Sequence, residues 1–192
     1  MHQPPHDATV HELIRMARVC DLQNNPSCPE RLRTVIAIAD DQKRMPTAEE
    51  LASFCDWSGA SNNAIQLLIS RASDYVNRSK ARLTEDHPEY FLPGGALHPQ
   101  ERAETCWRDC WNFLRVAIYA TALNIPKCTN PECIAAVRRL YTLMNVPIPG
   151  MQLALSTMAS VASAELISKG HHQESNCLKT TITHLQSSLN KD

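Results

Sequence analysis

The chemically richest segment of this 192-residue chain is Glu104-Thr105-Cys106-Trp107-Arg108-Asp109-Cys110-Trp111, which combines a thiol, a guanidinium group, a carboxylate and two indoles. Cys106, Asp109 and Cys110 have the i, i+3, i+4 spacing that places side chains on one face of a helix. A carboxylate on an apolar face is costly unless it meets a cation or hydrogen-bond donors. Two interpretations remain open. Either Arg108 or a neighbouring helix satisfies Asp109, or the face receives a ligand whose N–H groups Asp109 binds while a cysteine tethers it.

The other cysteines do not indicate a metal or catalytic site. The chain has eight cysteines but no C-x-x-C pair, and no signal peptide indicates the oxidising compartment that a disulfide framework needs. Most are therefore expected to be small buried residues; Cys110 could also be a second tether or a redox partner. Cys128 and Cys133 lack a nearby histidine or second cysteine pair, so no metal site is expected. No nucleophile-plus-base set or phosphate-binding glycine loop indicates an enzyme.

Composition excludes several classes of protein. Lys+Arg number 19 and Asp+Glu 20, so the net charge of −1 gives no attraction to nucleic acid or anionic lipid. No apolar run approaches the roughly 18 residues of a membrane span, so no direct membrane insertion is expected. With 43% hydrophobic and 20% charged residues, the chain is expected to fold as a globular protein. The N-terminus lacks the layout of a signal peptide, so the cytoplasm is the expected compartment.

The elements that position the chemical segment are expected to be helices. Glycine numbers only five residues and alternating β-branched runs are scarce, which argues against hairpins and strands. The patterns Thr9-x-x-Glu12, Thr47-x-x-Glu50 and Thr129-x-x-Glu132 are capping boxes. Apolar periodicity together with start and stop residues predicts helices over about 9–17, 32–45, 47–57, 65–82, 99–124, 129–144 and 150–169, and a weaker helical segment over 174–189.

Several motifs in order resemble one known family. They are Phe91-Leu92-Pro93-Gly94-Gly95, then Thr105-Cys106-Trp107-Arg108-Asp109, then Phe113-Leu114-Arg115-Val116-Ala117-Ile118-Tyr119, with weaker similarity through 138–161 and upstream at 39–51. This pattern resembles the phycobiliproteins, the bilin-carrying light-harvesting proteins of phycobilisomes. The resemblance implies an all-α, globin-like phycobiliprotein fold of about eight helices with an N-terminal helical arm. It also implies a globin-like domain at 34–192, with residues 1–33 as an N-terminal helical extension.

The resemblance further implies a light-harvesting or energy-transfer subunit of the allophycocyanin α type. Cys106 would form a thioether to phycocyanobilin or a related linear tetrapyrrole. Asp109 would accept hydrogen bonds from the inner pyrrole N–H groups, and Arg108 would pair with a propionate. Arg108 is also expected to favour the thiolate needed for attachment. Trp107 and Trp111 would either pack on the pigment or fill its cavity and exclude it.

The resemblance also implies partners. Asp40, Arg44 and Arg115 match positions at which two subunits join through the arm, where an acid on one chain meets an arginine on the other; Tyr119 matches such a position too, and we also include it among the pigment-binding residues. If they make no such contact, Asp40 and Arg115 would be solvated surface groups of little energetic value. The expected partners are another phycobiliprotein-like chain in a homo- or hetero-oligomer, phycobilisome linker proteins and a bilin lyase, with a phycobilisome holding the protein at the thylakoid surface.

Two departures from the family pattern support an alternative function. Residues 1–33 extend beyond the usual start, and Met45 stands where the arm usually has a tyrosine. The alternative is a pigment-free or weakly pigmented regulator or assembly protein that acts through its N-terminal extension.

Overall fold

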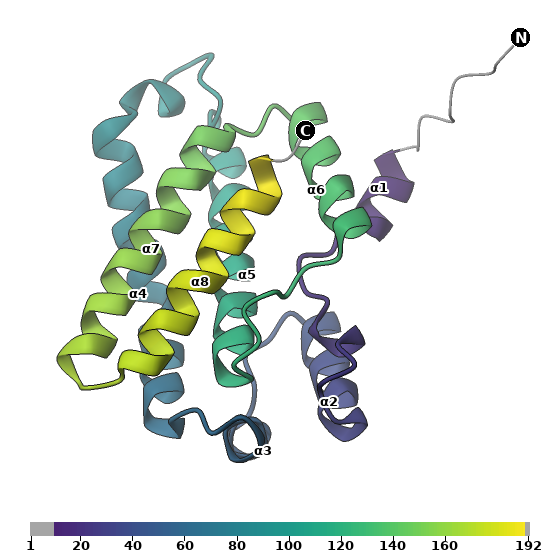
Figure 1. Cartoon of the computed structure of the whole chain (residues 1–192). Coiled ribbons are helices and arrows are strands. Elements are labelled where there is room, and N and C mark those ends of the chain that lie inside the picture. The colour runs from purple at the N-terminus through teal and green to yellow at the C-terminus, as the bar shows by residue number, and fades with distance from the viewer. Residues whose placement is uncertain (1–9, 191–192) are drawn as a thin grey trace, which may run out of the picture.

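The structure is a computed structural model that describes residues 10–190. The expected capping box at Thr9 therefore depends on a residue outside the described range. All regular structure between residues 10 and 190 is helical, which confirms the expected all-α class (Figure 1). The α-helices are α1 (Val10–Met16), α2 (Glu30–Asp41), α3 (Ala48–Ser58), α4 (Asn62–Asp86), α5 (Gln100–Ala122), α6 (Pro131–Leu143), α7 (Ile148–Ser168) and α8 (His172–Asn190), and the 3-10 turns are η1 (Leu22–Asn24) and η2 (Pro88–Phe91).

Local side-chain caps set where three of these helices begin, and Ser61 caps α4. At the start of α3 the Thr47 hydroxyl accepts the Glu50 N–H at 3.3 Å, and the Glu50 carboxylate accepts the Thr47 N–H at 2.8 Å, which confirms this capping box. At the start of α6 the prediction is wrong by one residue, because Asn130 caps the helix and Pro131 opens it. Thr129 instead makes a 2.8 Å hydrogen bond with His184 of α8.

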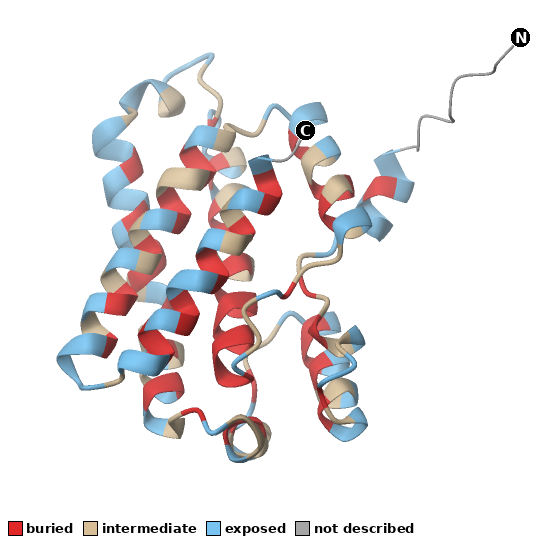
Figure 2. Ribbon diagram, viewed as in Figure 1, coloured by how far each residue is buried: buried red, intermediate tan, exposed pale blue. Residues whose placement is uncertain are grey.

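Helix α5 lies at the centre of the fold. Every residue from Phe113 to Ala122 is buried, and the lower half of α5 is coloured as buried where it is visible (Figure 2). Helices α4, α7 and α8 pack against α5 on one side, and α3 packs at its C-terminal end (Figure 1). A helix surrounded in this way needs mostly apolar residues on all faces. Arg115 and Thr121 are polar residues buried in its second half.

Polar contacts join the outer helices. Ser79 of α4 is fully buried and donates its hydroxyl to the Ala154 carbonyl of α7 at 3.0 Å. The buried Glu174 carboxylate of α8 accepts the Ser61 N–H at the start of α4, at 2.7 Å. This contact anchors the beginning of α8, which starts two residues before the expected position.

The segment before α2 packs against the body of the protein. Leu13 of α1 is buried, and α1 contacts α6. Cys20 is also buried, and the next residue, Asp21, donates its N–H to the Cys128 carbonyl at 2.7 Å. Helix α2 begins at Glu30 and continues beyond residue 33. A separate unit at residues 1–33 stays a prediction.

Candidate functional site

The loop before α5 has a conformation that requires glycine. A Cβ on Gly95 would meet the backbone carbonyl oxygens of Glu89 and Tyr90, so only glycine allows this close approach, and Gly94 has a positive φ of 87°. The tight turn holds η2 beside the first turns of α5. It thereby places Phe91 against the helix face that carries the chemical segment.

The space next to the Cys106 thiol is filled by aromatic side chains. Trp107 is 9% exposed, and its ring stacks on Phe91 with 6.3 Å between centroids and 18° between planes. The remaining cavity, lined by Cys106, Trp107, Leu83 and Met151, among others, is about 10 Å³. That is no more than the roughly 10–15 Å³ one water molecule needs, so Trp107 would have to move for a pigment ring to lie here.

The environment of Cys106 favours the neutral thiol. Burial raises the pKa of Cys106 to about 11; the nearby Asp109 carboxylate raises it as well, and Arg102 opposes them. Arg108 is exposed and donates to the Thr105 hydroxyl at 3.0 Å. The expectation that Arg108 favours the Cys106 thiolate is therefore wrong, because burial outweighs the effect of any nearby cation.

Cys110 and Trp111 pack toward the core. Cys110 is 2% exposed, its Sγ lies 3.7 Å from the Met151 Sδ, and burial raises the pKa of its thiol well above the usual range. Of the interpretations open for Cys110, this placement matches a buried core residue. Trp111 is half-buried and packs against the same core.

Asp109 is satisfied from a neighbouring helix. The Tyr141 hydroxyl of α6 donates to its carboxylate at 3.0 Å. Burial raises the pKa of Asp109, while this hydrogen bond opposes the rise. The hydrogen bond from Tyr141 fits the interpretation in which a neighbouring helix satisfies Asp109, and the charge of Arg108 also opposes the rise in the pKa of Asp109. The interpretation in which Asp109 binds a ligand stays a prediction. This role of Tyr141 cannot be read from the sequence, because Tyr141 lies on an apolar face and is 32 residues from Asp109.

Asp109 and Tyr141 also line a cavity of about 250 Å³, which we call the α1 cavity. Because a carboxylate can accept more than one hydrogen bond, Asp109 can bind further N–H donors here. Residues from four parts of the chain form its walls, among them Ile14, Ala17, Asp109, Arg115, Val137 and Tyr141.

These groups fit part of a linear tetrapyrrole. Asp109 offers acceptors for pyrrole N–H groups, and the buried Trp107 Nε1–H has no hydrogen-bond partner, so it could donate to a pigment oxygen. The α1 cavity is slightly smaller than the roughly 300–1,000 Å³ typical of sites for drug-sized ligands. The acceptor on Asp109 and the donor on Trp107 therefore fit the pigment. The space around Cys106 admits the pigment only if Trp107 changes position.

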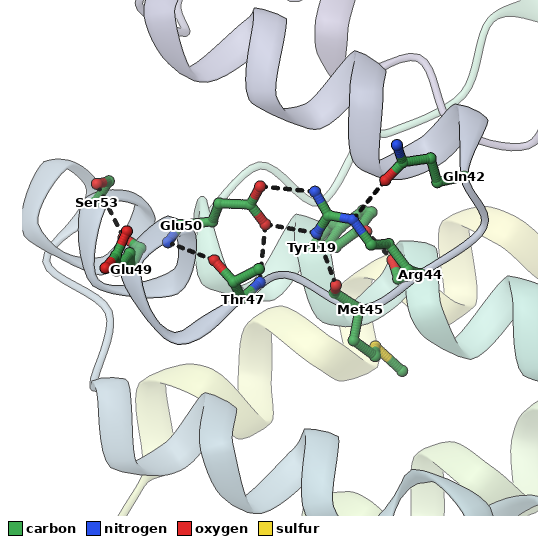
Figure 3. A network of polar contacts seen from close by, with 8 residues as sticks. All are labelled: Gln42, Arg44, Met45, Thr47, Glu49, Glu50, Ser53 and Tyr119. Carbon is green, nitrogen blue, oxygen red and sulfur yellow. Dashed lines mark hydrogen bonds and ion pairs between the residues drawn. The ribbon is translucent and has the colours of Figure 1, made fainter.

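Tyr119 contacts the segment that matches the family's N-terminal arm (residues 39–51), and it lies away from Cys106. Its hydroxyl donates to the Arg44 carbonyl oxygen (Figure 3). Its ring meets the Phe54 ring edge-on, with 6.5 Å between centroids. Two guanidinium nitrogens of Arg44 donate to the Glu50 carboxylate at 2.6 and 2.7 Å. Tyr119 does not line either cavity, so this placement supports an arm contact rather than a pigment contact.

Asp40 and Arg115 form an ion pair within one chain. The Arg115 Nη2 donates to the Asp40 Oδ1 at 2.6 Å, and the two residues are 1% and 2% exposed, respectively. Lys43 Nζ lies 3.7 Å from the same Asp40 oxygen. The two residues are therefore not solvated surface groups. Their role between two chains stays a prediction.

Comparison with known proteins places the chain in a family. A family model described as "Phycobilisome protein" matches residues 34–189. The chain belongs to the phycobilisome protein family. The allophycocyanin subunit alpha-B of Synechocystis sp. is 31% identical to it, over 67% of this chain and 81% of the relative. The alpha-B chain of Pyropia yezoensis is 29% identical over 69% and 84%, and the C-phycocyanin beta chain of Aglaothamnion neglectum is 26% identical over 68% and 78%.

Membership confirms the globin-like fold for this phycobilisome protein, and it confirms a pigment-carrying class of protein rather than an enzyme. The matched range begins inside α2, so α1 and η1 precede it. Among residues 10–190, no helix is long and apolar enough to cross a membrane.

Proposed function

We propose that this phycobilisome protein is a light-harvesting or energy-transfer subunit that resembles allophycocyanin and carries a linear tetrapyrrole on Cys106. The observation that supports the proposal best is the position of Asp109. Its carboxylate lies one helical turn from Cys106, is buried enough to raise its pKa, and lines a cavity with Tyr141. This places acceptors for pyrrole N–H groups next to a half-buried thiol.

The chain's residues would bind and orient the pigment, which itself supplies absorption and emission. Asp109 would hold the inner N–H groups and favour the protonated, cationic form of the pigment, since an opposite charge raises the pKa of a base. Arg108 is exposed and donates a hydrogen bond to the Thr105 hydroxyl, so its guanidinium can turn toward a propionate. Because the pKa of Cys106 is about 11, little thiolate exists at neutral pH, which favours attachment by a lyase that removes the proton.

The test is production of the full chain in cells that make phycocyanobilin and contain bilin lyases. We expect a coloured band that survives a denaturing gel and fluoresces with zinc. Cys106→Ala should abolish it, and Cys133→Ala, at a partly buried cysteine on α6, is the matched control. Asp109→Asn should keep the covalent band and change the absorption and emission. A Cys106→Ala protein that keeps a covalent pigment would overturn the attachment site.

We also propose that the protein assembles with another phycobiliprotein chain, as family members do. Linker proteins and a lyase would be further partners, and a phycobilisome would hold the assembly at the thylakoid surface. Co-purification of the tagged chain with phycobilisome fractions tests this. Recovery of the chain only as a monomer in fractions without phycobiliproteins would contradict it.

A second candidate function is a pigment-free regulator or assembly protein, and the position of Trp107 favours it. Trp107 stacks on Phe91 and leaves about 10 Å³ beside Cys106. If Trp107 excludes the pigment, the wild-type chain stays colourless with lyases present, and Trp107→Ala gains covalent colour. A wild-type chain that is coloured rules out exclusion by Trp107. Deletion of residues 1–19, the first part of the 1–33 extension, tests whether the extension binds a partner. Loss of partner binding would assign it a docking role.

A further inference from the structure

The α1 cavity contains a buried cation with unused hydrogen-bond donors. Arg115 is 1% exposed and lines the cavity. Its Nη2 donates to Asp40 and its guanidinium carbon lies 5.3 Å from the centroid of the Tyr119 ring, whereas its Nε and Nη1 are buried and have no hydrogen-bond partner among residues 10–190. Unpaired buried donors on a charged group are costly, and native structures rarely leave them so. Arg115 therefore has the capacity to bind an anion that enters the cavity.

The net charge of the groups around Arg115 in the α1 cavity is positive. Two cations, Arg115 at 2.6 Å and Lys43 at 3.7 Å, share the single carboxylate of Asp40. The other carboxylate that lines the cavity, Asp109, is six residues from Arg115 along α5, or about 9 Å along the helix axis. Its charge is partly satisfied by the Tyr141 hydroxyl. An anion at Arg115 thus meets excess positive charge without lying against Asp109.

The remaining walls determine the kind of anion. Apolar side chains from α1 and the segment after it, from α5 and from α6 surround the polar groups, and they are Ile14, Ala17, Val19, Val116, Val137 and Leu140. A strongly hydrated inorganic anion gains nothing from such walls, whereas an apolar body that presents a carboxylate does. Guanidinium is the side-chain group best matched to a carboxylate. Asn112 Oδ1, buried and unpartnered, adds an acceptor for an N–H group on the same ligand.

We propose that the α1 cavity is a carboxylate-binding site, in which Arg115 holds the anion and residues 14–19 cover it. The proposal goes beyond pigment attachment at Cys106 and does not depend on it. The carboxylate has two possible sources: a propionate of the linear tetrapyrrole, or a free small molecule of similar size. In the pigment case Arg115 binds a propionate in addition to the one assigned to Arg108.

The test is isothermal titration of the full, pigment-free chain with indole-3-propionate, which has a carboxylate, an N–H group and a ring of suitable size. The neutral analogue indole-3-propionamide is the control ligand. Loss of the charge should weaken binding roughly ten- to a hundredfold, the range expected for hydrogen bonds to a charged group. Equal affinity for the two ligands, or no binding of either at millimolar concentration, would overturn the proposal.

A variant that leaves the Asp40–Arg115 pair intact tests the location. Ala17→Phe fills the cavity from the segment that covers it and should abolish binding. Ile167→Phe, on the exposed surface of α7, adds bulk elsewhere and should not change the affinity. Binding that survives Ala17→Phe would place the ligand outside the cavity and overturn the proposal.

Pigment-loaded protein separates the two sources. If a propionate of the pigment lies on Arg115, loaded protein no longer binds indole-3-propionate, and Cys106→Ala protein, made without pigment, still does. If the natural ligand is a free carboxylate, loaded protein binds the probe with unchanged affinity. Both results presuppose binding to the pigment-free chain, so failure of pigment attachment and failure of this proposal are distinguishable.

Discussion

The Asp40–Arg115 pair gives the sharpest prediction about how the arm is held. We expect Asp40→Ala to destabilise the protein by about 3–5 kcal/mol, because it leaves a buried guanidinium without its partner. The structure places this loss at the upper end. Arg115 is 1% exposed, and its Nε and Nη1 have no hydrogen-bond partner among the described residues, so removal of Asp40 leaves the guanidinium with its contact to the Tyr119 ring and no described hydrogen-bond acceptor.

Substitution of the other partner, Arg115, should reduce the free energy of unfolding by less. Arg115→Met keeps similar volume and leaves Asp40 with Lys43, whose Nζ lies 3.7 Å away on a flexible and mostly exposed side chain. Replacement of both partners, in Asp40→Leu with Arg115→Met, should recover most of the stability, since apolar substitutes for a buried ion pair are often neutral. The exposed pair Arg82–Asp86, at 2.8 Å, is the control and should contribute at most about 1 kcal/mol.

Urea denaturation followed by circular dichroism measures these differences. For a chain of this length, 3–5 kcal/mol corresponds to a melting temperature lower by about 6–20 °C. Because the pair lies within one chain, the loss should not depend on protein concentration; a pair formed between two chains would make it concentration-dependent. A loss below 1 kcal/mol for Asp40→Ala, or a larger loss for Arg115→Met than for Asp40→Ala, would refute the reasoning.

Three further predictions concern single groups. Alkylation of Cys106 by iodoacetamide, followed by mass spectrometry, should accelerate about tenfold per pH unit between pH 7.5 and 9.5, because a thiol with a pKa of about 11 has little thiolate in that range; a flat profile would contradict the raised pKa. Tyr141→Phe should raise the pKa of Asp109, measured by carboxyl NMR titration, since the lost hydrogen bond favours the charged form; an unchanged pKa would show that the bond is not formed. Glu174→Ala should cost about 1.5–3 kcal/mol in urea denaturation, because the Ser61 N–H loses a charged acceptor; a loss equal to that of an exposed glutamate, Glu85→Ala, would refute the contact.

Much of the fold could be predicted because its signals are local. The Thr47 capping box and the apolar periodicity of α4 depend on residues three or four apart, so the sequence contains the whole cause. The predictions that failed concern the ends of helices, where contacts between one element and the next decide. Helix α2 ends at Asp41 rather than Met45, and the Lys43 backbone just beyond it has a positive φ of 52°, while the Arg44 guanidinium pairs with Glu50 of the next helix.

The sequence by itself determined the helical class, the family resemblance and the presence of a thiol and a carboxylate one turn apart on one helix. Only the tertiary structure decided what those groups meet. Tyr141 reaches Asp109 from α6, and Trp107 fills the space beside Cys106 through a stack on Phe91. The physical reason is that desolvation and hydrogen bonding depend on which helices pack together, so the raised pKa of Cys106 and the unpaired donors of Arg115 arise only when the chain is folded.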